Sequence, residues 1–254
     1  MAAFDFVDSA AQSYQFVWEK RQMLARLAFL PLMVKLGCFA AVILLGLEEN
    51  FLRQGLFLLP SYFAEGWLVC MVVRHALLPG RDAEGPAYVR TIIAAMIVYV
   101  LIQLIMSLLS ALALTGQAQA PAEAPPPTGE SFVAALLLLA FTLWAFRLIW
   151  LYIPVVLGYS VKDFLFKARG YRTSFYMIGT WLLCFVPFGL FLVIVSQLVL
   201  AALPAQGETL SLPYMVVMAA IQGAVEMLVA LVSSVAMAYG IRSIYEGAQK
   251  RKQP

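Results

Sequence analysis

Three charged residues lie deep inside long apolar stretches of this sequence. Arg147 stands in WAFRLIWLYIPVV, Glu226 in AAIQGAVEMLVAL and Glu65 in LPSYFAEGWLVC. A charged side chain at the centre of a bilayer costs about 2.5–3.5 kcal/mol on insertion scales, so each one requires a partner or a function. Arginine keeps its proton at any accessible pH, and the partner of Arg147 must therefore be a hydrogen-bond acceptor.

The three charges are predicted to lie at a similar depth. Each is twelve to fourteen residues from the polar end of its stretch, which at 1.5 Å per residue corresponds to roughly 18–21 Å. We therefore expect a buried ion pair between Arg147 and Glu226, with Glu65 as the second carboxylate or the alternative partner. Trp144 and Trp150 lie three residues to either side of Arg147, where indole rings can hold a guanidinium by cation–π contact.

Further polar residues accompany these charges at helical spacing. Gln222 precedes Glu226 by one turn, and Gln103 and Ser107 are one turn apart in another apolar stretch. Polar residues of this kind usually face the inside of a membrane bundle and hydrogen-bond across helices. Two interpretations stay open: a clamp that fixes the register of the helices, or a functional site that relays a proton or ion or anchors a substrate.

The elements that position these residues are predicted to be membrane-spanning helices. Of the 254 residues 63% are apolar and 12% are charged, which excludes an ordinary soluble domain. Six stretches reach the length of about 20 residues that a helix needs to cross ~30 Å of hydrocarbon. They cover 29–47, 55–78, 89–114, 132–158, 175–203 and 213–240. We expect an all-α polytopic bundle of six transmembrane helices over 29–241.

Basic residues alternate between the connections and predict the orientation. Fourteen of the 17 Lys and Arg residues lie before the first stretch, in the second and fourth connections, and after the last stretch. The positive-inside rule then places both termini, including a basic tail over 242–254, in the cytoplasm of a bacterium, with the bundle in its inner membrane. Anionic lipid headgroups account for the net charge of +3, so no nucleic-acid partner is expected.

Three segments outside the spans carry predictions of their own. Residues 1–28 alternate as an amphipathic helix that would lie in the cytoplasmic interface with Tyr14 and Trp18 at headgroup level; a docking helix for a partner is the alternative. Residues 115–130, TGQAQAPAEAPPPTGE, predict a flexible outer loop. Pro187 and Gly189 in the fifth stretch predict a kink that could serve as a hinge.

Motifs for catalysis or metal binding do not emerge from the sequence. It has one histidine and no GxSxG, HExxH, P-loop or GxGxxG pattern. EENFLR at 48–53 fits the EExxxR pattern of the intramembrane prenyl proteases, but that family also needs two histidine motifs. The three cysteines lie inside apolar stretches without a CxxC pair. We expect no catalytic residues, no metal and no cofactor.

Residues 146–183 carry a resemblance to known proteins. Pro154 and Gly158 close a span ahead of a basic loop with Lys167 and Gly170. This pattern, with an N-terminal amphipathic helix that ends near a proline, resembles a group of bacterial inner-membrane proteins that includes the YciC-type proteins and the membrane domain of some glycerophosphodiester phosphodiesterases. The resemblance implies six helical spans and no catalytic residues.

The sequence thus predicts a non-enzymatic function. We expect an accessory or scaffold subunit that packs against other membrane proteins or further copies of the chain, or a protein that organises lipid. The alternative is a small secondary transporter or proton-coupled carrier that uses Glu65, Arg147 and Glu226, with Pro187 and Gly189 as a hinge.

Overall fold

The computed structural model describes residues 5–47, 51–78, 86–118, 129–202 and 212–250. Over these ranges the chain forms helices and short turns and no strand, which confirms the predicted all-α class. Six helical segments are long and apolar enough to cross a membrane, so the chain is a multi-pass membrane protein. The described helices are α1 (Phe6–Glu19), α2 (Arg21–Leu44), α3 (Phe51–Leu77), α4 (Pro86–Ala118), α5 (Gly129–Ala145), the 3₁₀ helix η1 (Phe146–Trp150), α6 (Tyr152–Val156), α7 (Val161–Lys167), α8 (Tyr171–Ala202) and α9 (Leu212–Lys250).

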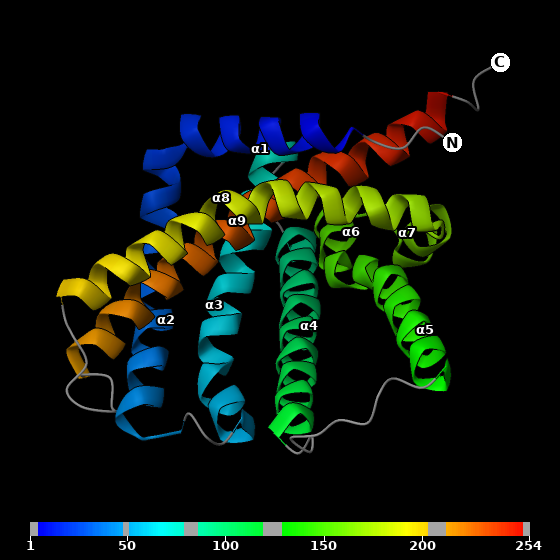
Figure 1. Ribbon diagram of the computed structural model, residues 1–254. Helices are drawn as coiled ribbons and strands as arrows, with labels where there is room; N and C mark the ends of the chain where they lie inside the picture. The colour runs from blue at the N-terminus through cyan, green and yellow to red at the C-terminus, as the bar shows by residue number, and fades with distance from the viewer. Residues whose placement is uncertain (1–4, 48–50, 79–85, 119–128, 203–211, 251–254) are drawn as a thin grey trace.

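The long helices fall into two groups. In Figure 1, α2, α3, α4 and α5 stand side by side, and α8 and α9 cross them obliquely. The closest neighbours are α2 with α3, α3 with α4, and α8 with α9. α1 lies across one end of the bundle, and α9 ends on that same side (Figure 1). An even number of spans has this consequence, since each pair of spans returns the chain to the side from which it started.

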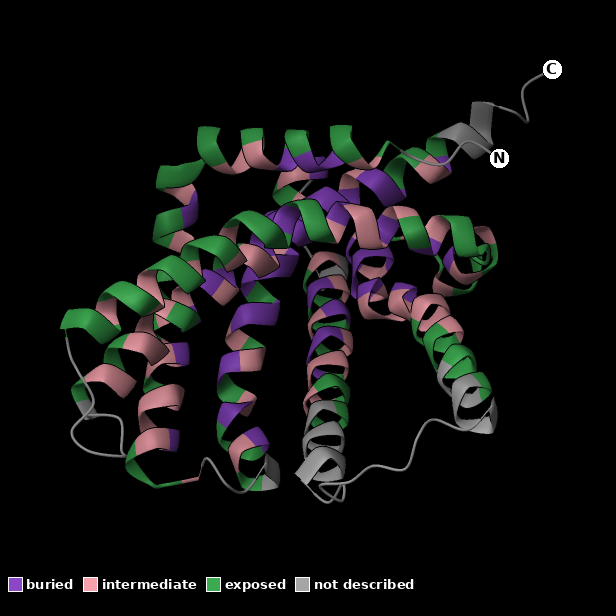
Figure 2. Cartoon of the chain, viewed as in Figure 1, coloured by how far each residue is buried: buried purple, intermediate pink, exposed green. Residues whose placement is uncertain are grey.

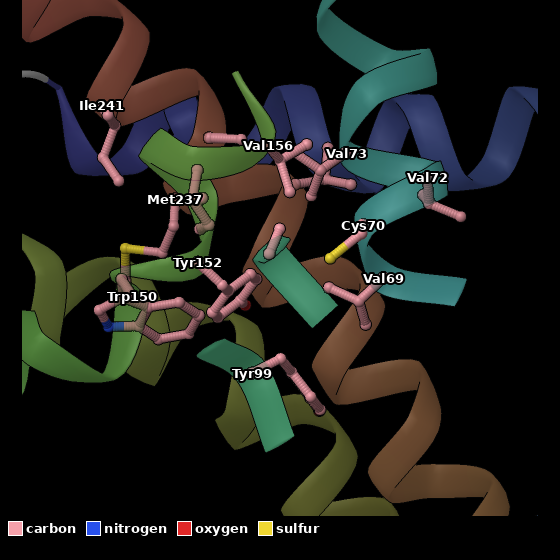
Figure 3. Close-up of a cluster of buried hydrophobic side chains, with 14 of the residues drawn as sticks. Val69, Cys70, Val72, Val73, Tyr99, Trp150, Tyr152, Val156, Met237 and Ile241 are labelled. Atoms are coloured by element: carbon pink, nitrogen blue, oxygen red, sulfur yellow. The ribbon is translucent and has the colours of Figure 1, made fainter. Parts of the chain in front are cut away.

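The hydrophobic core lies near the end of the bundle that α1 covers. Figure 2 shows buried residues gathered where α3, α4, α6 and α9 meet, while most of α8 is exposed. In Figure 3, Tyr99 of α4 and Tyr152 of α6 lie at the centre of this core, with their rings edge to face at 5.1 Å. Because lipid tails are as apolar as these side chains, the core is held by close packing and not by exclusion from water.

The predicted interfacial helix ends earlier than residue 28. Asp5 caps α1 by accepting from the backbone N–H groups of Val7 and Asp8 at 2.9 and 3.2 Å. The chain turns at Lys20, and α2 begins at once with Arg21. Leu24 is 4% exposed and joins the core, so residues 21–28 belong to the membrane-length helix and not to the amphipathic one.

Helix extends into two segments that were predicted to lie outside the spans. α4 continues to Ala118 and α5 begins at Gly129, so helix covers both ends of the outer loop predicted over 115–130. α9 likewise extends through most of the basic tail predicted over 242–254. Good helix formers such as Ala, Leu and Gln extend the helices past the apolar stretches that hydropathy detects. The remainders, 119–128 and 251–254, lie outside the described residues.

The fourth span is not the single straight helix predicted over 132–158. α5 ends at Ala145, η1 follows, and α6 ends at a turn where Gly158 has a φ of +74°. Tyr152 and Ile153 are nearly fully buried directly after η1, so the interruption turns this part of the chain into the core. Most residues of α5 whose burial is described are exposed, and the helix packs against η1 and α8 (Figure 2).

Candidate functional site

A cluster of charged and polar side chains joins four helices inside the bundle. Lys35 Nζ of α2 lies 2.7 Å from Glu65 Oε2 of α3 and 3.0 Å from Glu226 Oε2 of α9. Tyr99 of α4 donates its hydroxyl to Glu65 Oε1 at 2.6 Å, and Gln222 donates its amide to Glu226 Oε1 at 2.8 Å. Each of the four carboxylate oxygens therefore has a donor, which is the condition for holding charge away from water. We call these five residues the Lys35 cluster.

The Lys35 cluster is closed on one side and open on the other. The side chains of Lys35 and Glu65 are 6% and 7% exposed, whereas that of Glu226 is 43% exposed. Gln222 is exposed as well. The cluster is thus sealed between α2, α3 and α4 and reaches the surface along α9. Its two carboxylates and one ammonium sum to a formal charge of −1 when all three are ionised.

Two glycines allow the helices to approach closely enough to form the Lys35 cluster. A Cβ on Gly66 would lie 2.9 Å from Cδ1 of Tyr99, so only glycine lets this ring pack on α3 beside Glu65. A Cβ on Gly223 would lie 3.1 Å from Cε2 of Phe39, which sits on α2 one turn after Lys35. Small residues at such contacts are typical of membrane helix packing.

The polar face predicted on α4 supports the cluster. Gln103 hydrogen-bonds Tyr99, and Ser107 hydrogen-bonds Tyr62 of α3. Ser61, one turn before Glu65, is buried, and its hydroxyl has no hydrogen-bond partner in the described part of the chain. The structure therefore brings together Glu65, Glu226, Gln222 and Gln103, all singled out in the sequence, around a lysine that the sequence analysis did not identify.

Arg147 does not belong to the Lys35 cluster. Its Nη1 donates to the backbone oxygen of Ala168 at 2.7 Å, and its guanidinium lies 4.3 Å from the ring centroid of Trp144. The cation–π contact with Trp144 is confirmed, but the predicted ion pair with Glu226, or with Glu65, is wrong. The interruption at η1 is the reason, because it places Arg147 beside the connection that follows α7 and not at the depth expected of a straight helix.

α1 is docked onto the chain's own helices. Ser13 donates to the backbone oxygen of Val232 in α9 at 2.6 Å, and Tyr14 donates to those of Leu183 and Cys184 in α8, both at 3.2 Å. Burial, with a smaller effect from Cys184, raises the pKa of Tyr14 to about 12. Tyr14 thus packs against α8, whereas Trp18 is 72% exposed. That both lie at headgroup level stays a prediction.

The Tyr14 contact bears on the predicted hinge. α8 runs through Pro187 as one helix, and proline cannot donate to the carbonyl four residues earlier, which is that of Leu183. Tyr14 supplies the missing donor. A Cβ on Gly189 would lie 3.3 Å from Phe185 of the same helix. A hinge at Pro187 and Gly189 stays a prediction, and any bending there would have to release Tyr14.

Comparisons with known proteins add no assignment to this geometry. No protein-family model, curated protein or solved structure matches the chain. Within the described ranges, no group of three or more His, Cys, Asp and Glu residues could hold a metal ion. Function therefore has to be argued from the exposure of the helices and from the arrangement of the Lys35 cluster.

Proposed function

We propose that the chain is a non-enzymatic accessory or scaffold subunit of a membrane complex, placed in a bacterial inner membrane with both termini in the cytoplasm. The observation that carries this proposal is the exposure of α8. α8 is 32 residues long, and only 6% of the residues in its most apolar part are buried by the rest of the chain. Leu190, Phe191 and Ile194 are each more than half exposed, and so present a broad packing surface. Another membrane protein could pack there by van der Waals contact.

The proposal is tested by gentle extraction of the tagged full chain from its own membrane into native nanodiscs, followed by mass spectrometry. We expect a stoichiometric partner. The variant L190W/I194W, which adds bulk on one face of α8, should lose that partner. The matched variant L101W/I105W, on an exposed face of α4, should keep it. Recovery of the chain without any partner, or equal loss from both variants, would contradict the assignment.

A proton- or cation-coupled carrier is the second candidate, and the charge balance of the Lys35 cluster favours it. Lys35 is fourteen residues into α2, or roughly 21 Å from its start, at a depth where an uncompensated charge is costly. One further proton or monovalent cation would bring the formal charge of −1 to zero. Glu226 offers the route, because it is the more exposed of the two carboxylates in the cluster. Lys35 is the counter-charge of the two carboxylates, the role that was predicted for Arg147.

The carrier is tested with purified protein in liposomes that contain a pH-sensitive dye. Under an imposed cation gradient, we expect proton or cation flux that disappears in Glu226→Gln. The matched variant Glu19→Gln removes an exposed carboxylate from α1 and should leave the flux unchanged. Full flux in both Glu65→Gln and Glu226→Gln would end this candidate.

A further inference from the structure

The corner between α1 and α2 carries an exposed group of basic and aromatic side chains. Trp18 is 72% exposed at the end of α1, and Lys20, Arg21 and Arg26 are exposed around the turn into α2. In the described part of the chain, none of these three basic residues forms a salt bridge with a carboxylate. Glu19 is exposed at the same turn, and the corner still keeps a net positive charge from its three basic residues.

Arg21 is held in position for an external anion. Its guanidinium lies 5.0 Å from the ring centroid of Trp18, and its Nη1 donates to the backbone oxygen of the same residue at 3.0 Å. A guanidinium has five N–H donors, and this hydrogen bond uses one of them. A stacked guanidinium with free donors suits a phosphate, which accepts two parallel hydrogen bonds.

An exposed apolar stripe continues from the basic corner along α2. Phe29 and Met33 follow Arg26 at i+3 and i+7, and Gly37 follows at i+11, so all four lie on one helix face. Phe29 is 63% and Met33 43% exposed, and a Cβ on Gly37 would meet no atom within 4 Å. The opposite face of α2 buries Lys35. From Arg26 to Gly37 the helix rises roughly 16 Å, about half of the ~30 Å of hydrocarbon in a bilayer.

We propose that this surface, formed by Trp18, Arg21 and Arg26 with Phe29, Met33 and Gly37, binds a phospholipid with an anionic headgroup. Arg26, on the face of the stripe, holds the phosphate, Arg21 at the turn above it adds positive charge, and one acyl chain lies along the stripe for the depth of one leaflet. The basic residues lie at one end of the surface and the apolar stripe continues from them, which matches a phospholipid better than an acidic segment of a protein. A soluble acidic segment would match the charges but leave Phe29 and Met33 uncovered. The surface is distinct from the Lys35 cluster and does not depend on either proposed function.

The test uses the fluorescence of Trp18 in the full chain, reconstituted in liposomes. Small amounts of a brominated phospholipid are added, either phosphatidylglycerol, which is anionic, or phosphatidylcholine, which is zwitterionic. The contribution of Trp18 is the difference between the wild type and Trp18→Phe. We expect the anionic lipid to quench Trp18 at lower mole fraction than the zwitterionic lipid. Since a basic residue near an anionic surface is worth about 1 kcal/mol, each guanidinium removed should weaken this preference about fivefold.

Matched variants separate a site from general surface charge. R21Q/R26Q should abolish the preference, whereas Arg169→Gln should leave it unchanged, although Arg169 is also exposed and lies 4.7 Å from the ring centroid of Phe166. Native mass spectrometry of the same proteins should show fewer retained phosphatidylglycerol molecules in R21Q/R26Q alone. Equal quenching by the two lipids, or an unchanged preference in R21Q/R26Q, would overturn the proposal. Absence of quenching by either lipid would also overturn it, because protein would then cover the surface.

Discussion

Replacement of Lys35 by methionine tests whether the Lys35 cluster holds the bundle together. Methionine is unbranched, resembles lysine in length and is apolar, so the variant removes the charge with little change in volume. Glu65, whose side chain is 7% exposed, would keep the hydroxyl of Tyr99 but lose its only counter-charge in the cluster. Glu226 would lose the same partner and keep Gln222. The formal charge of the cluster would change from −1 to −2.

The expected loss is large because only one partner of a buried pair is removed. Breaking such a pair costs about 3–5 kcal/mol, since a buried charge is left without compensation. Glu65→Gln alone should cost about 1 kcal/mol, because Lys35 keeps Glu226 and the amide can still accept from Tyr99. The double variant K35M/E65Q should recover about 2–3 kcal/mol relative to Lys35→Met. Residues in contact couple in this way, whereas distant residues give additive losses.

The cysteines provide the assay. Cys70 and Cys184 are fully buried, so a thiol-reactive dye reports their exposure as the detergent-solubilised protein unfolds on heating. The charge swap Arg147→Glu with Glu226→Arg serves as the contrast. The structure predicts no rescue for that pair, because Arg147 bonds Ala168 and not Glu226. Additive losses for Lys35 and Glu65, or rescue by the Arg147 swap, would refute our account of the cluster.

Three further predictions concern the contacts around the Lys35 cluster and α1. Gly223→Leu should destabilise the protein by about 1–3 kcal/mol and move α9 away from Phe39, which thermal unfolding and hydrogen exchange on α2 would detect. Tyr99→Phe should cost about 1–3 kcal/mol in the same thermal assay, because it leaves a buried carboxylate oxygen of Glu65 without its donor. Tyr14→Phe should cost about 1 kcal/mol and speed amide exchange in α8 near Pro187. Because the pKa of Tyr14 is raised from 10 to about 12, its contribution should be complete below pH 10 and be lost as the pH rises through 12, so wild type and Tyr14→Phe should converge there.

Hydropathy was sufficient to predict the fold class but not the ends of the helices. The apolar stretch at 29–47 identified the first span, yet α2 begins at Arg21. Hydropathy did not detect this start, because the first turns of α2 carry polar and charged residues. The same turns still pack into the core through Leu24. This boundary matters for the site. With a start at residue 29, Lys35 would be in the second turn of the helix; in the structure it is fourteen residues into α2, and its side chain is 6% exposed.

The partner of the two carboxylates could not be predicted from the sequence for a related reason. The depth argument for Arg147 assumed a straight helix over 132–158. It did not use Pro154, which cannot donate to the carbonyl of Trp150, the last residue of η1. Trp150, the last residue of η1, and Tyr152, at the start of α6, are both buried in the core. By contrast, Gln103, Gln222, Glu65 and Glu226 were predictable, since helical spacing alone places polar residues on the inside of a bundle.

α9 links the Lys35 cluster to α1. Glu226 contributes to the cluster, and six residues further along the same helix, roughly 9 Å away, Val232 accepts from Ser13 of α1. Ser234 then hydrogen-bonds Tyr152 of α6 at 2.7 Å. A displacement of α9 that separates Glu226 from Lys35 must therefore strain or break its contacts with α1 and α6 as well. The carrier proposal places the transported ion at Glu226, so in that case the docking of α1 should respond to whatever engages Glu226.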